Sequence, residues 1–428
     1  MKTFLSAHRM MLADVLLLII ALTLPFYQQA SIFGIIALVL VWISQKQNFK
    51  NLSLLINHKE VIALIIFFMW HLIGLLWSEN LHYGWQDIQT KLSFLVFPLV
   101  LGTLIVSKES FQKVKSAFVA GTIIACIYCT INALIRYAQT NDETVFFYKF
   151  YSVLMHVSYF SMYINLSMLF ILEISIERWN QCSIVKKSEI VLALFFLLVN
   201  LIIITARTAI AAALITIMTY SIVKIIKIKK GLVILIGSLA VSSAISFYST
   251  HLFNRYSQVE EAIEKYRENP PPSNNKPAQQ EIYNSTTSRV EFWKNALTVI
   301  KQNWIIGVGT GDIKEELVAQ YAKVGFQYGV ENRFSPHDQY LHTTVILGVI
   351  GLAILLCCLL LPLRLAIQKR NWIFICFQLM IMLDAITESI LERQNGIIFY
   401  AFFNLLFLNQ ILIRKNSEPA TLNTGSAK

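Results

Sequence analysis

Three side chains are the strongest candidates for chemistry in this sequence: Arg207, Arg289 and His337. Arg207 lies between two apolar runs, Arg289 opens an amphipathic segment, and His337 directly precedes another apolar run. An imidazole, with an unperturbed pKa of about 6.5, is the best proton acceptor available near neutral pH. Each residue also has an ordinary interpretation: an anchor at a span end, a surface charge, or a hydrogen bonder at a membrane boundary.

The elements that must position these residues are membrane helices. Of the 428 residues, 56% are hydrophobic and 14% are charged, whereas soluble chains contain roughly 25% charged residues. The apolar runs predict an all-α polytopic membrane protein with about twelve spans. The expected spans are residues 11–27, 30–45, 61–77, 92–107, 116–136, 154–174, 189–205, 208–224, 231–249, 338–362, 372–388 and 394–413.

The distribution of Lys and Arg predicts the orientation. These residues concentrate in every second short loop, so both termini are expected in the cytoplasm. The first apolar run is interpreted as a retained span, because another apolar run follows it and no small-residue cleavage site does. The net charge of +11 fits cytoplasmic loops of a membrane protein better than a nucleic-acid partner.

Four regions follow: transmembrane helices 1–9 (residues 1–249), an extracytoplasmic loop (250–336), transmembrane helices 10–12 (337–413) and a cytoplasmic tail (414–428). In the loop, residues 254–269 predict an amphipathic helix and 270–287 a flexible stretch. Residues 288–302 predict a helix with an apolar side suited to the membrane interface. Asp312 and Glu315 predict a capping box that starts a helix ending near 323.

Four segments resemble the O-antigen ligase and polymerase superfamily. His337-Asp338 is followed by nine residues and then Gly348-Val349-Ile350-Gly351, and upstream Arg289 stands four residues before Trp293. The other two resembling segments are Thr205-Ala206-Arg207-Thr208 and 387–394. The sequence departs from the family pattern at Asp338, where Asn is more usual, and at Asn303-Trp304, where a proline usually follows the first residue.

The resemblance implies a glycosyltransferase of the bacterial inner membrane with its site facing the periplasm. It would move a glycan from undecaprenyl diphosphate to an acceptor hydroxyl, such as one on lipid A-core, with inversion. Arg207 and Arg289, helped by Lys91, would bind the diphosphate. His337 would accept the hydroxyl proton, and Asp338 would orient His337 or favour its imidazolium form.

Several related predictions concern the surroundings of this site. Glu388, Glu392 and Arg393 are expected on the same outer side, either in a polar helix-end network or in catalysis. No cofactor is expected, and no cluster with metal-ligand spacing points to a metal. Gly307, Gly309 and Gly311 are expected to let the loop turn sharply towards the lipid head group.

Alternative functions remain open at this stage. A polysaccharide polymerase or a protein O-oligosaccharyltransferase of the same superfamily would use the same donor, so only the acceptor distinguishes them. The ligase is favoured because the tail from Lys415 is short and polar. A secondary transporter is the alternative from another class, but its intramembrane candidates Asp14, His71 and His156 are not clearly paired.

Overall fold

The computed structural model describes residues 2–204, 207–225 and 287–413, and this part of the chain consists of helices joined by loops, with no strand. The predicted all-α membrane fold is confirmed. Six described helical segments are long and apolar enough to cross a membrane, and there are seven if α2 (Gln28–Ile43) and α3 (Lys46–Leu55), which meet at 88°, form one broken span. Three further apolar helices are shorter. The expected span at 231–249 lies outside the described residues, so the count of twelve stays a prediction.

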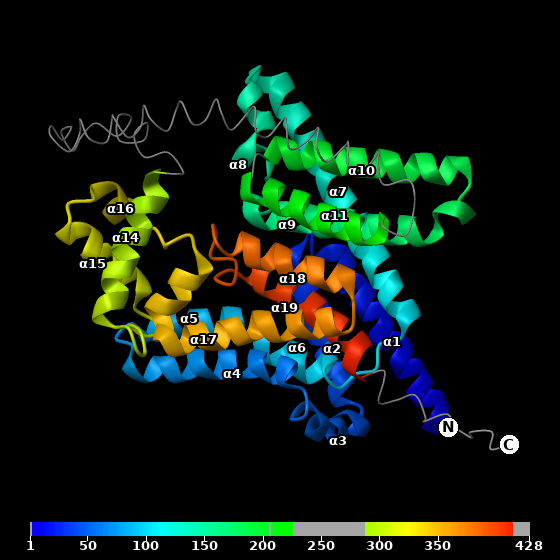
Figure 1. Cartoon of the computed structure of the whole chain (residues 1–428), viewed down its shortest axis with the longest axis horizontal. Coiled ribbons are helices and arrows are strands. Elements are labelled where there is room, and N and C mark those ends of the chain that lie inside the picture. The colour runs from blue at the N-terminus through cyan, green and yellow to red at the C-terminus, as the bar shows by residue number, and fades with distance from the viewer. Residues whose placement is uncertain (1, 205–206, 226–286, 414–428) are drawn as a thin grey trace.

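One layer of the molecule is a bundle around α19 (Gln394–Leu408). Every residue of this helix from Gly396 to Leu408 is buried, as expected for a helix that is apolar on all sides. Phe399 and Phe407 stack on aromatic rings of neighbouring helices, and Phe403 meets the ring of Phe118 edge to face. Figure 1 shows the surrounding helices, which are α4 (Lys59–Ile73), η1 (Gly74–Trp77), α5 (Leu81–Lys91), α6 (Ser93–Leu101), α17 (Gln339–Gln368), α18 (Trp372–Asp384) and η4 (Asn409–Ile413).

The remaining described helices complete the fold. They are α1 (Lys2–Thr23), α7 (Lys108–Thr140), η2 (Glu143–Phe146), α8 (Tyr148–Tyr151), α9 (Val157–Arg178), η3 (Trp179–Gln181), α10 (Ile184–Ile204) and α11 (Arg207–Ile225). In the apolar 18-residue stretch of α9, 78% of the residues are buried inside the protein, whereas in that of α10 only 22% are. An apolar helix so little covered by protein is expected to face lipid.

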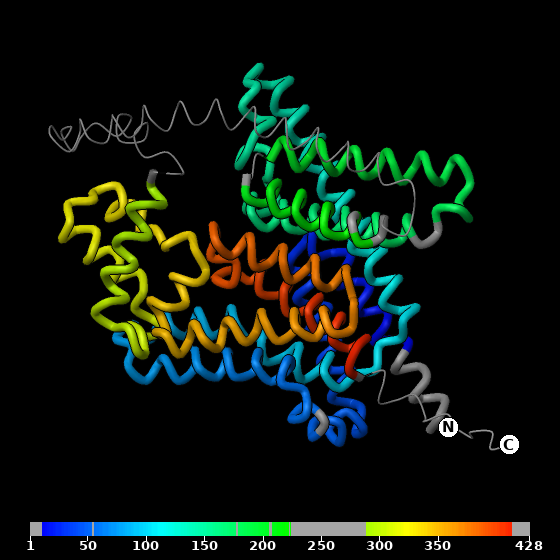
Figure 2. Tube along the Cα trace, in the orientation of Figure 1, coloured from blue at the N-terminus to red at the C-terminus, as the bar shows by residue number. Residues whose placement is uncertain are grey.

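The described helices between α11 and α17 gather at one end of the bundle (Figure 2). Its helices are α14 (Thr287–Gln302), α15 (Ile313–Lys323) and α16 (Gln327–Asn332), which confirms the helices predicted at 288–302 and up to 323. The predicted helix at 254–269 lies outside the described residues. The apolar side of α14 does not lie on the membrane interface as expected: Phe292 and Val299 are buried against α15 and α17, so protein covers this face.

The expected capping box at the start of α15 is not formed. The Asp312 side chain makes no cap to its own helix. Instead, its two carboxylate oxygens accept hydrogen bonds from the backbone N–H groups of Glu79 at 2.8 Å and Asn80 at 2.7 Å. Charge-assisted bonds of this kind are stronger than neutral ones, so Asp312 ties α15 to the turn before α5.

A break in α17 joins this helix to the loop after α14. At Gly348 the backbone is non-helical, with φ 66°, a conformation that glycine adopts without steric cost. The N–H groups of Val308, Gly309 and Val349 bond across the break to the carbonyls of Val345, Ile346 and Trp304 at 2.8–2.9 Å. A Cβ atom on Gly348 would lie 2.1 Å from the carbonyl oxygen of Ile305.

The glycines of the loop allow close contacts within the protein, and the expected approach to a lipid head group stays a prediction. A Cβ atom on Gly307 would lie 2.3 Å from the backbone of Ile346, and one on Gly311 would lie 2.1 Å from the carbonyl oxygen of Asn80. The glycines therefore allow two backbone segments to pack against each other.

Candidate functional site

His337 forms a hydrogen-bonded pair with Glu388. The imidazole Nδ1 lies 3.1 Å from the carboxylate Oε1. The His337 side chain is 28% exposed and that of Glu388 is 13% exposed, so the pair is partly shielded from solvent but reachable. An ionised carboxylate can only accept, so in the neutral imidazole Nδ1 carries the proton and Nε2 keeps the lone pair. This tautomer is the one a general base requires.

The turn that carries His337 is held by α14. The indole N–H of Trp293 donates to the carbonyl oxygen of Pro336 at 3.1 Å. The rings of Phe292 and Phe334 lie 5.7 and 6.0 Å from the imidazole, centroid to centroid. The backbone of His337 is left-handed, with φ 49°, which is uncommon for a residue with a side chain. Packing and the indole hydrogen bond therefore maintain a backbone conformation that is unfavourable for an isolated histidine.

Glu388 is positioned by contacts between its loop and the start of α17. The N–H of Gln339 donates to the carbonyl of Ala385 at 2.8 Å, and the Gln339 side-chain oxygen accepts from the N–H of Leu391 at 2.7 Å. Ser158 at the start of α9 donates its hydroxyl to the second carboxylate oxygen of Glu388 at 3.2 Å. Both oxygens of Glu388 are thus engaged.

The charges around Glu388 keep it ionised. Burial alone would raise its pKa, but the hydrogen bond from His337, the His337 and His156 imidazoles when protonated, and the Arg289 guanidinium together lower the pKa to about 2. The carboxylate is therefore negative throughout the physiological range. It can stabilise the imidazolium that forms when His337 takes a proton.

A second histidine, His156, faces the same pair. It stands at the N-terminal end of α9, and its ring Nδ1 accepts from the N–H of Ser158 at 3.5 Å. Burial lowers the pKa of His156, and Arg393, His337 and Arg289 act in the same direction while Glu388 opposes them. His156 is thus part of the same polar cluster as His337 and Glu388 and does not stand alone in mid-span.

Arg289 belongs to the same cluster through its charge. It acts electrostatically on Glu388, His156 and Tyr148. Arg289 and Trp293 are four residues apart on α14 and so share one face of the helix. One face of α14 therefore carries both the cation and the indole that holds the His337 turn.

Arg207 is the first residue of α11, and its side chain lies outside the described part of the structure. The next residue is placed, however: the Thr387 hydroxyl donates to that of Thr208 at 2.9 Å. Because Thr387 adjoins Glu388, the start of α11 lies beside the candidate site.

Two predicted substrate-binding residues have other contacts. Lys91 is 1% exposed and forms a buried ion pair with Asp87, four residues earlier on α5. The expectation that Lys91 is accessible to substrate at the end of a span is therefore not met. Asp338 does not bond to His337 but caps α17, accepting from the N–H of Leu341 at 2.7 Å. Burial raises the pKa of Asp338, while hydrogen bonds from Leu341 and Tyr340 oppose the shift.

The described residues contain no group of three or more His, Cys, Asp or Glu side chains arranged to hold a metal ion. The candidate site instead combines a His–Glu pair, a second histidine, Arg289 and Arg393, all contributed by the ends of α9, α14, α17 and the loop before α19. Such a set can accept a proton and bind an anionic group.

This geometry defines a class of protein: a polytopic helical membrane protein with a His–Glu pair and arginines at one end of its bundle. The family model described as O-antigen ligase matches residues 192–356. The match contains Arg207, Arg289, His337 and Gly348, and it confirms the resemblance to the O-antigen ligase superfamily, whose members are glycosyltransferase-like ligases and polymerases. A comparison with curated proteins finds no match.

Sequence reasoning did not select Ser158 or His156 for this site, and it gave Glu388 a structural role at least as readily as a catalytic one. Glu388 follows the family match by more than thirty positions. The one signal for it was the resemblance of 387–394 to a recurring family segment. No motif or spacing singles out Ser158, because its contact with Glu388 spans 230 residues.

Proposed function

We propose that this protein is an O-antigen ligase-like glycosyltransferase that moves a glycan from undecaprenyl diphosphate to an acceptor hydroxyl of lipid A-core at the periplasmic face of the bacterial inner membrane. The observation that carries the proposal is the His337–Glu388 contact beside Arg289. The family match over 192–356 supports the class of donor.

In the proposed reaction the acceptor oxygen attacks the anomeric carbon of the first sugar. The bond between that carbon and the phosphate oxygen breaks, and undecaprenyl diphosphate leaves with the bonding electrons. The hydroxyl proton passes to Nε2 of His337, and Glu388 stabilises the resulting imidazolium. Attack opposite the leaving group inverts the anomeric configuration.

The leaving diphosphate gains negative charge as the bond breaks. Arg207 and Arg289 are proposed to bind it, because a guanidinium remains charged and matches phosphate oxygens in pairs. This charge balance requires no metal ion or cofactor. Lys91 and Asp338 are proposed to support the site through the fold, since each already satisfies a partner within the protein.

Complementation of a host that lacks its own ligase tests this function. Wild-type, His337→Ala and His82→Ala proteins are produced at matched membrane levels, and lipopolysaccharide is resolved on a gel. His82 is an exposed histidine on α5 and serves as the control. Wild type and His82→Ala should attach glycan to lipid A-core, whereas His337→Ala should lower the transfer rate by about 10²–10⁴-fold. Normal transfer by His337→Ala would refute the general-base assignment.

A polymerase of the same superfamily is the second candidate, because it would use the same donor and the same pair. The two functions differ in product. In cells, a polymerase would lengthen lipid-linked glycan but would not attach it to lipid A-core. The purified polymerase would extend lipid-linked repeat units with no lipid A-core present.

A further inference from the structure

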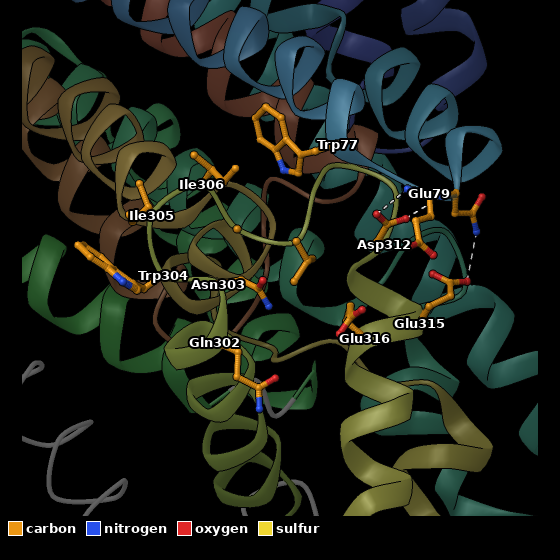
Figure 3. A pocket seen from close by; sticks show the side chains of 13 residues that line it. Trp77, Glu79, Gln302, Asn303, Trp304, Ile305, Ile306, Asp312, Glu315 and Glu316 are labelled. Atoms are coloured by element: carbon orange, nitrogen blue, oxygen red, sulfur yellow. Dashed lines mark hydrogen bonds between the residues drawn. The ribbon is translucent and has the colours of Figure 1, made fainter.

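A cavity of about 690 Å³ opens between the end of α4 and the extracytoplasmic helices, away from the His337–Glu388 pair. Figure 3 shows its walls: Trp77 on one side, Asp312, Glu315 and Glu316 from α15 on another, and the loop 302–306 on a third. The volume lies in the range of pockets that hold small organic ligands. Nothing in the proposed chemistry of His337 uses this cavity.

The lining combines aromatic, amide and carboxylate groups. Trp77 and Trp304 provide indole rings, Asn80, Gln302 and Asn303 provide amides, and Glu79 and Glu316 provide exposed carboxylates. Trp304 is 58% exposed, and the indole N–H of Trp77 is buried without a hydrogen-bond partner. A buried N–H without a partner costs free energy unless a ligand or water supplies an acceptor.

The cavity is built in advance by contacts that do not involve a ligand. Asp312 bonds to the backbone of Glu79 and Asn80, and Thr310 donates to the carbonyl of His71 at 2.6 Å. The loop that precedes Thr310 is bonded to α17 at the Gly348 break through Trp304, Val308 and Gly309. A site held in its binding shape loses less entropy when a ligand enters.

The charge of the lining selects against phosphate. Among the described residues that line the cavity there is no Lys, Arg or His, but there are four carboxylates. Arg333 lies outside this lining and pairs with Glu315 at 3.1 Å. A diphosphate would therefore be repelled here and attracted to the arginines of the His337 site. Sugar rings suit the cavity, because their C–H faces pack on indoles and their hydroxyls donate to carboxylates and amides.

We propose that this cavity, lined by Trp77, Trp304, Glu79 and Asn303, is a subsite for an uncharged, hydroxyl-rich saccharide. Arg289 and Gln302 stand thirteen residues apart on α14, about 20 Å along the helix axis. The bound sugar thus lies several units from the reacting bond. The assignment of this sugar to a substrate of glycan transfer rests on the proposed function. The binding of saccharide by the cavity does not depend on that function.

Binding is measured by saturation-transfer NMR and calorimetry on the full chain in nanodiscs. Two probes distinguish the source of the sugar: dephosphorylated core oligosaccharide from lipopolysaccharide and O-polysaccharide released from its lipid. Inorganic phosphate and methylammonium are the comparison ligands. Trp304→Ala removes an exposed ring, Trp77→Phe removes the N–H but keeps a ring, and Trp85→Ala is the control because Trp85 is 53% exposed on α5 and does not line the cavity.

Binding of either oligosaccharide that weakens about ten-fold in Trp304→Ala and is unchanged in Trp85→Ala would support the proposal. A smaller loss in Trp77→Phe would support it further. No saccharide binding by wild type, equal binding by Trp304→Ala, or binding of methylammonium alone would overturn it. Equal binding by Trp304→Ala would make Trp304 a membrane anchor, and binding of methylammonium alone would make the cavity an ammonium site.

The same samples separate this proposal from the proposed function. His337→Ala should lose transfer but bind the oligosaccharide as wild type does. If wild type binds saccharide but transfers no glycan, the proposed function fails and the subsite stands. If wild type transfers glycan but binds neither oligosaccharide, the subsite fails and the proposed function stands.

Discussion

Trp293 donates its indole hydrogen to the carbonyl oxygen of Pro336, 43 residues further along the chain and directly before His337. The Arg–x–x–x–Trp segment thus has two separate tasks on one helix face. Arg289 supplies positive charge beside Glu388, whereas Trp293 fixes the turn from which His337 projects.

Replacing Trp293 with Phe should lower the rate constant for transfer and leave the KM for the lipid-linked donor nearly unchanged. The ring remains, but the hydrogen bond that holds the His337 turn is lost. A net hydrogen bond of about 1 kcal/mol predicts a decrease of roughly five- to ten-fold. Steady-state kinetics of purified protein checks this, with Trp85→Phe as the control. A selective rise in KM would instead place Trp293 in donor binding.

Replacing Glu388 with Gln should lower transfer by about ten- to a hundred-fold, because the neutral amide cannot stabilise the imidazolium of His337. The amide keeps the shape and can still contact Ser158. Ser158→Ala, which removes one hydrogen bond to the second carboxylate oxygen, should have a smaller effect. A Glu388→Gln enzyme as fast as wild type would show that the carboxylate only supports the loop.

The lowered pKa of Glu388 also predicts that the stability of the protein depends on pH. Its pKa is lowered from 4.5 to about 2, so its contribution to stability is fully present above about pH 4.5 and is lost as the pH falls towards 2. The difference in Tm between wild type and Glu388→Gln in detergent should therefore be largest above about pH 5 and shrink on acidification. A difference that grows below about pH 4.5 would contradict this sign.

Gly348→Ala should be strongly destabilising, and Gly325→Ala offers a matched comparison. Both glycines have positive φ, 66° and 71°, but an added Cβ meets the Ile305 backbone at Gly348 and nothing within 4 Å at Gly325. Left-handed strain alone costs about 1–2 kcal/mol, so Gly325→Ala should lose roughly that much. Gly348→Ala should lose more, measured as Tm and as membrane yield. Equal losses would mean that the loop moves away from α17 without cost.

The buried ion pair on α5 separates a structural role of Lys91 from a role in substrate binding. Lys91→Met leaves Asp87 buried and uncompensated, which should cost about 3–5 kcal/mol. The double variant Lys91→Met/Asp87→Leu should recover much of that stability and retain transfer activity. A stable double variant without transfer would return Lys91 to the list of substrate-binding residues.

Local sequence pattern predicted the membrane helices and the loop helices at 288–302 and 313–323, because apolar periodicity and helix-start signals depend on neighbouring residues. It did not predict the partners of Asp312 or Lys91, since a carboxylate before a helix can cap that helix or bind a distant backbone. The contact of His337 with Glu388 joins residues 51 positions apart. Such contacts follow from how the helix ends pack, which local pattern does not contain.

The break at Gly348 also has a mechanical consequence. Val349 bonds to Trp304 in the loop instead of continuing the helical ladder of α17, so we expect bending of α17 to concentrate at this joint. The short helical segment from Gln339 to Leu347 belongs instead to the block that contains α14 and the His337 turn. We therefore expect the His337 turn to move little when bilayer thickness changes, and the proposed transfer rate to vary little among lipids of different chain length.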